Sequence, residues 1–511
     1  MILSDIIKRN AERYPQKTGL VSGSVRFTFG ELNRRINCMA NALTDLDMHM
    51  GDKVAVLLDN CHQFVELYFA ILKAGGVAVP LNPALKSEEI AYILNNAQAN
   101  ILVFGERFAD VVDSLRNQLD SVKNLVVVGT PGKGTKSYEQ LIAQYPAVEP
   151  EARVGEQELA YLLYTSGTTG LPKGVMVTHR GMIESALNYL LGYRLRPEDI
   201  GLVTAPLFWG ASLFVIIVPH FYLGCTIVLS NDFTPKAILD LIQKERITTG
   251  FMVPSMITAL LEYPHLSHYN TSSLRHVWFG GGPMAVETLR RAIDAFNNVF
   301  FQLYGLVELT PVTLIIPEEQ VIEGPPEKVK RLASCGREAC NVEVRVVDEE
   351  GRNVKPGQVG EIIARGDNVM KGYWRIPQAT EEALRGGYMH TGDMGTVDEN
   401  GYIYLVGRKK DLIVSGGRNI YPVEVEEVIY QHPSVVEAAV IGVPDNKLGE
   451  SIKAVVVVRE GENIAEVNII EFCRQRLPDY ARPKSVVFVD KLPRNPAGKI
   501  LKRVLREKFQ F

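Results

Sequence analysis

Residues 164–174 hold the densest set of groups in this chain that could bind a chain of phosphates. The segment reads YTSGTTGLPKG, and it combines four aliphatic hydroxyls, three glycines and one lysine. Glycine lets backbone N–H groups come close to a ligand, hydroxyls donate hydrogen bonds, and a lysine adds a mobile positive charge. Such a loop suits a polyphosphate. The residues expected to contact it are Thr165, Ser166, Gly167, Thr168, Thr169, Gly170 and Lys173.

This loop differs from the phosphate loop of common nucleotidases. That motif ends in Gly-Lys-Ser/Thr and opens a helix, whereas residues 172–174 read PKG and enter an apolar run at 175–178. Another apolar run, 159–163, precedes the loop, and both runs are typical of buried strands. The alternative is a flexible linker. A linker seldom lies between two apolar strands, so phosphate binding is favoured.

Two further strands are expected to end in groups that could bind a nucleotide. Residues 277–279 lead into Gly280, Gly281, Gly282 and Pro283, where a flat group could rest against the backbone. Residues 300–308 deliver Tyr304, Gly305 and Glu308 together. A tyrosine can stack on a purine, and a carboxylate can hold Mg²⁺ against phosphates. Alone, each segment would equally suit a strand end with ordinary solvated side chains.

Three later positions could also do chemistry. Asp393 follows a glycine turn, a placement typical of carboxylates that bind ribose hydroxyls. Arg408 begins a run of four charged residues that ends at Asp411, and this run interrupts a predicted strand. Residues 493–501 form a predicted turn that presents Lys499 just before the last helix.

The elements that must position these groups follow an alternating pattern. Residues 1–150 alternate strand and helix patterns, which predicts an α/β fold of layered, largely parallel sheets. Residues 342–347 and 360–364 alternate like half-exposed strands, which favours a small β-barrel-like lobe. Residues 412–511 form a compact α+β tail. We therefore place a large domain at 1–407, a hinge at 408–411 and a small domain at 412–511.

Composition excludes several classes of protein. The 511 residues are 46% hydrophobic and 22% charged, and the net charge of -4 gives no reason to expect nucleic acid as a partner. Six scattered cysteines without a Cys-x-x-Cys motif fit a reducing cytoplasm, and no signal peptide is recognisable. Residues 207–229 are apolar enough to span a bilayer, but a buried helix, a turn and a buried strand explain them better. Peripheral membrane contact and homo-oligomers are left open.

Taken together, these motifs resemble the adenylate-forming (ANL) superfamily, and within it the acyl-CoA synthetases, or fatty acid–CoA ligases. Six stretches carry the resemblance in the expected order: 164–174, 280–283, 304–308, 391–393, 407–420 and 493–499. The resemblance implies a large domain, a small mobile domain and a site between them. It also implies that a carboxylic acid, ATP and CoA become acyl-CoA, AMP and pyrophosphate through an acyl-AMP intermediate.

The resemblance assigns roles to individual residues. It implies that Lys499, Glu308 and Lys173 are catalytic, with Glu308 binding Mg²⁺. Tyr304 and Gly305 would join residues 281–283 around adenine, while Asp393 and Arg408 would hold the ribose. The small domain would pivot at Lys410, and CoA would pass Ser415, Gly416, Gly417 and Arg418.

Two positions depart from the pattern of the superfamily. Val307 stands where a threonine is usual, and valine cannot donate a hydrogen bond to the α-phosphate. Trp209 stands where many members have histidine or aspartate. Without that aspartate nothing balances an α-amino group, so an apolar fatty, cyclic or aromatic acid is expected. The residues expected around the acyl group are Trp209, Phe214, Gly280 and Gly305.

Other functions fit the same motifs. The main alternative is a stand-alone adenylation enzyme that loads an acyl group onto a carrier-protein thiol. A luciferase-like oxidase and a catalytically inactive nucleotide-binding regulator are less favoured. An inactive relative should lack the charged groups, yet Lys173, Glu308 and Lys499 are all present.

Overall fold

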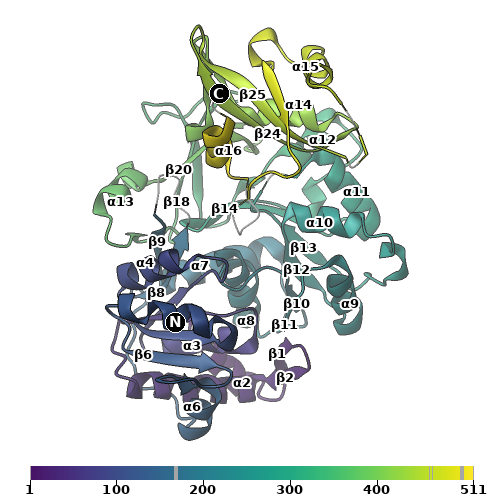
Figure 1. The fold of residues 1–511 in the computed structure, drawn as a ribbon. Coiled ribbons are helices and arrows are strands. Elements are labelled where there is room, and N and C mark those ends of the chain that lie inside the picture. Colours follow the sequence, from purple (N-terminus) through teal and green to yellow (C-terminus); the bar gives the residue numbers. More distant parts are fainter. Residues whose placement is uncertain are drawn as a thin grey trace. The chain divides into compact units, whose positions relative to one another are not determined.

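The computed structural model describes residues 2–165, 171–282, 284–459, 461–462, 464–494 and 500–509. The chain forms two compact units (Figure 1). The first unit comprises Met1–Leu332, Gly336–Glu343 and Ala364–Met389, and the second comprises Ala333–Cys335, Val344–Ile363 and His390–Phe511. The second unit therefore begins before residue 408, and the predicted boundary and hinge at 408–411 stay predictions.

One sheet of the first unit contains the two strands that flank the predicted phosphate loop. Its order is β19 (Gly372–Tyr373), β9 (Lys173–Thr178), β8 (Leu159–Thr165), β4 (Val77–Pro80), β3 (Lys53–Leu57), β5 (Ala99–Gly105), β6 (Asn124–Val128) and β7 (Lys136–Ser137). Strands β8 and β9 pair antiparallel, with Tyr164 opposite Gly174 and Thr165 opposite Lys173. Helices α4 (Ser87–Ala97) and α5 (Ala109–Leu115) pack apolar side chains on this sheet. The prediction of two strands around the loop is confirmed.

The second sheet of this unit has nine strands. Its order is β16 (Arg337–Glu338), β15 (Leu309–Ile315), β14 (Phe300–Leu306), β13 (His276–Phe279), β12 (Thr249–Met252), β10 (Ile200–Val203), β11 (Thr226–Leu229), β1 (Thr18–Ser22) and β2 (Val25–Thr28). Helices α9 (Pro235–Glu245), α10 (Pro254–Leu261) and α11 (Val286–Phe296) lie beside β10–β13 and share one apolar core with them (Figure 1). Strands β1 and β10–β14 run parallel to one another, so their carboxyl ends form one edge.

The remaining helices of the first unit connect and cover these sheets. They are α1 (Asp5–Arg13), α2 (Phe29–Asp45), α3 (His62–Lys73), α6 (Tyr138–Gln144), α7 (His179–Tyr193), α8 (Val218–Leu223), α12 (Pro326–Val329) and α13 (Pro377–Ala383). Helix α2 begins with a reciprocal cap between Thr28 and Glu31, which satisfies backbone donors of its first turn. Thr178 caps α7, because its hydroxyl accepts from the N–H of Gly181.

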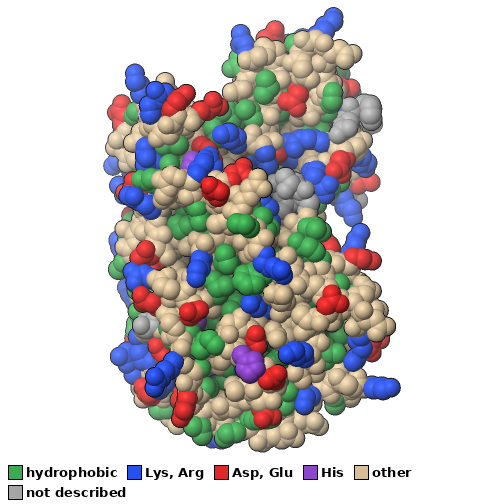
Figure 2. All heavy atoms as spheres, turned by 90° about the vertical axis from the view of Figure 1, so that its left-hand side faces the viewer, with side chains coloured by type: hydrophobic (Ala, Val, Ile, Leu, Met, Phe, Trp, Pro, Cys, Tyr) green, Lys and Arg blue, Asp and Glu red, His purple; other side chains and the backbone are tan. Residues whose placement is uncertain are grey.

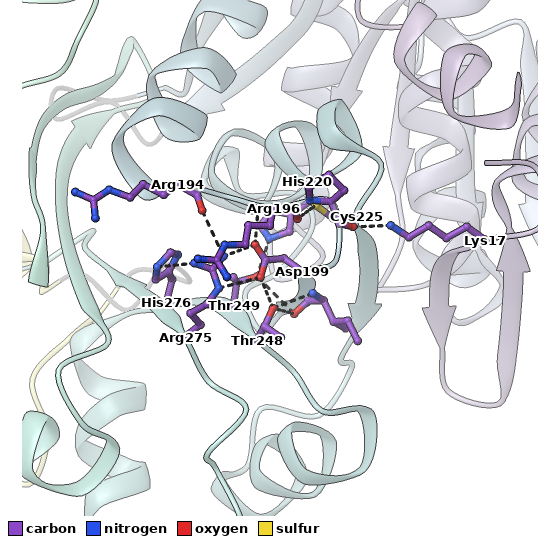
Figure 3. A network of polar contacts seen from close by, with 12 residues as sticks. Lys17, Arg194, Arg196, Asp199, His220, Cys225, Thr248, Thr249, Arg275 and His276 are labelled. Atoms are coloured by element: carbon purple, nitrogen blue, oxygen red, sulfur yellow. Dashed lines mark hydrogen bonds and ion pairs between the residues drawn. The ribbon is translucent and has the colours of Figure 1, made fainter. Parts of the chain in front are cut away.

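A buried polar network fixes the opposite, amino-terminal edge of the second sheet (Figure 3). The Asp199 carboxylate accepts from the Thr248 hydroxyl at 2.9 Å and forms an ion pair with Arg275. Burial alone would raise the pKa of Asp199, but the hydrogen bonds from Arg275, from the Arg196 backbone and from Thr248 lower it. The network joins the starts of β10, β12 and β13, which keeps the opposite edge in a fixed register.

Residues 207–229 form buried structure, as the sequence predicts. A π-helix (Ser212–Ile217) runs into α8, and β11 follows. Pro219 lies in the first turn of helix α8 and does not interrupt the helix, since a helix start tolerates proline. Gly224, with φ of 75°, ends the helix. Within the described residues, no helix is long and apolar enough to cross a membrane.

The second unit contains a four-stranded and a five-stranded sheet. The first has the order β17 (Glu343–Val347), β18 (Gly360–Arg365), β20 (Met389–Val397) and β21 (Ile403–Arg408). The second has the order β23 (Arg418–Ile420), β22 (Ile413–Ser415), β25 (Gly449–Val458) and β24 (Val435–Asp445), with β26 (Ser485–Phe488) parallel to β25. Helices α14 (Pro422–Tyr430), α15 (Glu466–Arg474) and α16 (Lys502–Phe509) complete the unit. The predicted α/β fold with a small β lobe and an α+β tail is confirmed.

Figure 2 shows one face of the molecule, on which lysine, arginine, aspartate and glutamate side chains are intermixed. Interspersed charges of both signs agree with the small net charge of -4. A nucleic-acid-binding face would instead gather basic side chains.

Candidate active site

Lys173 and Glu308 both contact one tyrosine, Tyr373, in the first unit. Lys173 is the first residue of β9, and Glu308 lies in the tight turn between β14 and β15, where Leu306 pairs with Leu309. The Tyr373 hydroxyl donates to Glu308 Oε1 at 2.9 Å. Lys173 Nζ lies 5.1 Å from the centroid of the same ring. The structure therefore brings together two of the predicted catalytic residues and adds a third side chain.

Several predicted site residues lie outside the described part of the chain. These are Ser166, Gly167, Thr168, Thr169, Gly170, Pro283 and Lys499. Of the phosphate loop, the structure describes its two ends, Thr165 at the end of β8 and Lys173 at the start of β9. The roles of all these residues stay predictions.

The glycines after β13 lie beside the end of β14. Strands β13 and β14 are parallel neighbours, with Phe279 opposite Gln302. A Cβ on Gly280 would lie 2.5 Å from the Leu303 carbonyl oxygen, so no larger residue fits there. At Gly282, by contrast, an added Cβ would meet no atom within 4 Å. The chain thus passes from a glycine that is closely packed against β14 to one with open space around it, which suits a flat ligand against the backbone.

Tyr304 and Gly305 complete the carboxyl end of β14. Tyr304 is 9% exposed and pairs with Thr313 of β15. A Cβ on Gly305 would lie 2.7 Å from Thr310 Oγ1. Gly305 is therefore needed for packing, whether or not it also borders an acyl group.

Asp393 and Arg408, the predicted ribose-binding pair, form an ion pair in the second unit. They lie opposite each other on β20 and β21, and Arg408 Nε is 2.6 Å from Asp393 Oδ1. The Asp393 N–H donates to Thr391 Oγ1 at 3.0 Å, and the Thr391 hydroxyl donates to the Ile362 carbonyl. These contacts hold the carboxylate in one orientation, which a ribose site requires.

The predicted hinge and CoA residues follow directly. Lys410 lies in a short 3-10 turn (Lys409–Asp411), where partial desolvation and the positive Arg408 lower its pKa. Gly416 and Gly417, with φ of 57° and 75°, form the turn between β22 and β23, and Ser415 pairs with Arg418. A two-residue hairpin with both φ positive requires glycine-like residues. The turn geometry therefore explains why glycine occupies both positions, independently of any role in CoA binding.

Trp209 and Phe214 differ in exposure. Trp209 is half-buried, with its ring 6.2 Å from that of Phe208, whereas Phe214 is only 3% exposed at the start of the π-helix region. Asn60 fixes the segment before Trp209: its side chain donates to the Ala205 carbonyl at 3.1 Å and accepts from the Leu207 N–H at 2.7 Å. An acyl-pocket role for Trp209 and Phe214 stays a prediction.

Sequence reasoning missed Tyr373 and Asn60. Tyr373 lies in the segment Gly372-Tyr373-Trp374, which carries no charge and no catalytic spacing. Its position 65 residues after Glu308 gives no local signal of their contact. The only available clue is the glycine before two aromatic residues, a pattern that indicates a strand in close contact with its neighbours.

The side chains favour a metal ion that arrives with phosphates over a resident metal site. Among the described residues, no group of three or more His, Cys, Asp or Glu side chains could hold a metal. Glu308 supplies a single half-buried carboxylate. Mg²⁺ is commonly held by one or two carboxylates together with substrate phosphates and water, so Glu308 fits that ion.

Comparisons with known proteins agree along the whole chain. The model of the AMP-binding enzyme family matches residues 7–374, and that of the AMP-binding enzyme C-terminal domain matches 424–499. A feruloyl-CoA synthase of Amycolatopsis is 38% identical over 98% of both chains. A long-chain fatty-acid–CoA ligase of Mycobacterium tuberculosis is 35% identical over 96% of this chain and 94% of that one. The crystal structure of an anthranilate–CoA ligase with anthranoyl-AMP superposes with a TM-score of 0.91, at 27% identity over 99% of this chain and 97% of that one.

Proposed function

The chain belongs to the AMP-binding enzyme family, in the acyl-CoA synthetase branch of the adenylate-forming superfamily, and from this premise we propose that it is an acid–CoA ligase for an apolar carboxylic acid. In the first step the carboxylate attacks the α-phosphorus of ATP, forming acyl-AMP and releasing pyrophosphate. In the second step the CoA thiol attacks the acyl carbon, forming the thioester and releasing AMP.

One observation carries the proposal: Lys173 and Glu308 both contact Tyr373, and Lys173 directly follows the predicted phosphate loop in the sequence. The first step brings a carboxylate anion onto a polyphosphate anion, so positive charge must be ready where negative charge gathers. Lys173 supplies it from the start of β9, and Lys499 is proposed to supply it at the reacting carboxylate. Mg²⁺ bound at Glu308 would neutralise phosphate charge.

We propose that the nucleotide is held through both its base and its sugar. Tyr304 and residues 281–283 take adenine, since an aromatic ring and an open glycine backbone accept a flat base. Asp393 accepts hydrogen bonds from the ribose hydroxyls, and Arg408 keeps that carboxylate oriented through its 2.6 Å ion pair. The Asp393 side chain is only 8% exposed, and Arg408 contacts both of its carboxylate oxygens, at 2.6 and 3.5 Å.

The second step needs a path for the thiol. We propose that CoA passes the turn at Gly416 and Gly417, where a side chain would narrow the path, and that Arg418 contacts a CoA phosphate. Arg418 lies over the Tyr480 ring at 4.6 Å, so its guanidinium is partly ordered before CoA binds. Lys410 is proposed as the hinge about which residues 412–511 change their arrangement relative to residues 1–407 between the steps.

The acid is proposed to be apolar. Trp209 has a large half-buried ring. Phe214, which follows it closely in the sequence, is buried. A compact aromatic acid could pack on the indole, and a fatty chain could pass it. The similar enzymes named above include both kinds.

A panel of acids tests the proposal. We would supply ferulate, indoleacetate, a long-chain fatty acid and phenylalanine with MgATP, and measure exchange of labelled pyrophosphate into ATP and formation of the CoA thioester. We expect both signals with at least one apolar acid and neither with phenylalanine. Exchange without a CoA thioester would favour the carrier-protein alternative, and no exchange with any acid would refute the ligase proposal.

A further inference from the structure

A short strap, residues 369–374, connects the two sheets of the first unit at the candidate site. On one side Val369 pairs with Leu309, and the Met370 N–H donates to the Glu308 carbonyl at 2.8 Å. On the other side β19 pairs with β9, and the Trp374 N–H donates to the Gly174 carbonyl at 2.8 Å. The strap is therefore bonded both to the residue that carries the carboxylate and to the strand that begins with the lysine.

The side chain of Tyr373 repeats this connection. Its hydroxyl donates to Glu308 Oε1 at 2.9 Å, and its ring faces Lys173 Nζ at 5.1 Å. A hydroxyl donor fixes one carboxylate oxygen and leaves the lone pairs of the other available for a cation. An aromatic face attracts an ammonium without neutralising it. Each charged group is thus oriented and still has its charge available for a ligand.

The two charged groups that contact Tyr373 do not form an ion pair with each other among the described residues. Glu308 contacts the hydroxyl of Tyr373, and Lys173 contacts its ring. A direct ion pair would make the lysine less available to phosphates and the carboxylate less available to a metal. Tyr373 is neutral, so its contacts leave both charges in place.

Trp374, the last residue of the strap, also contacts helix α4 and strand β3. The Trp374 Nε1–H donates to the Asn96 carbonyl at 3.0 Å, and the Lys53 ammonium lies 4.3 Å from the Trp374 ring centroid. Gly372, with φ of 141°, could not carry a Cβ, which would lie 2.6 Å from Thr380 Cγ2. The backbone on both sides of Tyr373 is therefore fixed, so its hydroxyl has a defined position.

We propose that Tyr373 is a positioning residue for MgATP: its hydroxyl orients Glu308 for the metal, and its ring holds Lys173 for the phosphates. This inference rests on the proposed function. Side chains that hydrogen-bond a metal-binding carboxylate typically change metal affinity or activity about 10- to 100-fold when removed. A cation–π contact at a partly exposed site corresponds to about a two- to fivefold change in binding.

Two substitutions separate these effects. Tyr373→Phe removes the hydroxyl and keeps the ring, so we expect the Mg²⁺ concentration needed for half-maximal ATP binding to rise about 10-fold or more. Binding of ATP in EDTA should not change. Tyr373→Leu removes both, so metal-free ATP binding should also weaken about two- to fivefold. Isothermal titration calorimetry of ATP over a series of Mg²⁺ concentrations measures both quantities.

Tyr388→Phe is the matched control. The Tyr388 hydroxyl donates to Glu343 Oε1 at 2.5 Å in the same unit, and it has no proposed role in the site. Unchanged Mg²⁺ dependence in Tyr373→Phe, or an equal shift in Tyr388→Phe, would overturn the inference. If the wild-type protein binds MgATP but no acid supports pyrophosphate exchange, the ligase proposal fails and the calorimetric test of Tyr373 still holds. If the wild-type protein does not bind MgATP, both fail.

Discussion

At the residue scale, the most informative pair is Asp393 and Arg408. Both were predicted from sequence as ribose ligands, and the fold places them opposite each other on β20 and β21. The side chain of Asp393 is 8% exposed and that of Arg408 29% exposed. A nearly buried ion pair is often a structural feature, so the ribose role needs a test that separates binding from stability.

We expect Asp393→Asn to raise KM for ATP about 10- to 100-fold, because hydrogen bonds to a charged acceptor contribute about 1.5–3 kcal/mol. The substitution keeps the shape of the side chain and removes its charge. Steady-state kinetics at saturating acid and CoA measure the change. Asp348→Asn is the control, since Asp348 forms an exposed ion pair with Arg352 at 2.9 Å in the same unit. A similar KM in both variants would count against ribose binding.

At the element scale, substitutions of the glycines after β13 test packing and ligand binding separately. Gly280→Ala should lower the thermal midpoint, because its Cβ would lie 2.5 Å from a backbone oxygen of β14 that cannot move freely. Gly282→Ala should leave the midpoint unchanged, because its Cβ would meet no atom within 4 Å, and should weaken ATP binding. Differential scanning calorimetry and ATP titration test the two expectations. A stable Gly280→Ala protein would mean that β13 and β14 can separate at this point.

His220, in the polar network at the amino-terminal edge of the second sheet, predicts how the stability of the protein depends on pH. His220 is fully buried, and its Nε2 accepts from Thr249 while its Nδ1 donates to the Ile216 carbonyl (Figure 3). Burial lowers the pKa of His220 from 6.5 to about 4. The unfolded chain therefore binds a proton below pH 6.5 that the folded chain binds only near pH 4. The contribution of His220 to the free energy of unfolding is fully present above pH 6.5 and decreases as the pH falls towards 4.

We expect the free energy of unfolding to fall by up to about 1.4 kcal/mol per pH unit for this histidine between those values. Thermal unfolding at pH 7.5, 6 and 5 measures the trend. His220→Gln should be less stable at pH 7.5, because buried hydrogen bonds are lost, and should depend less on pH. An equally steep decline in the variant would assign the effect to other groups.

The sequence predicts elements better than contacts between them. The strands around the phosphate loop, the strands near 342–347 and 360–364 and the α+β tail are all present, because hydrophobic periodicity is a local signal. The bond between Tyr373 of β19 and Glu308 in the turn between β14 and β15 connects the two sheets of the first unit and has no local signal. The π-helix after Trp209 was likewise not predicted, since an apolar run has the same pattern in an α-helix and a π-helix.

At the scale of the whole molecule, each unit has its own core. Apolar clusters of the first unit lie on its two large sheets, and those of the second gather around β24 and β25. Units with separate cores can move as bodies relative to one another. The two apolar clusters of the second unit contain only residues from Ile413 onwards, so the part of this unit beyond the proposed pivot at Lys410 has a core of its own.

The hinge proposal predicts opposite defects in two variants. Lys410→Pro should keep pyrophosphate exchange and reduce thioester formation at least about 10-fold, because proline fixes φ near -65° and removes the rotation that a hinge needs. Lys410 lies in a 3-10 turn, and such turns typically have φ between about -50° and -70°, which proline can adopt, so folding should be preserved. Lys499→Ala should lose pyrophosphate exchange and still convert supplied acyl-AMP and CoA to thioester. If Lys410→Pro forms thioester at the wild-type rate, the pivot lies elsewhere; if Lys499→Ala loses both reactions equally, the two steps share one arrangement of the units.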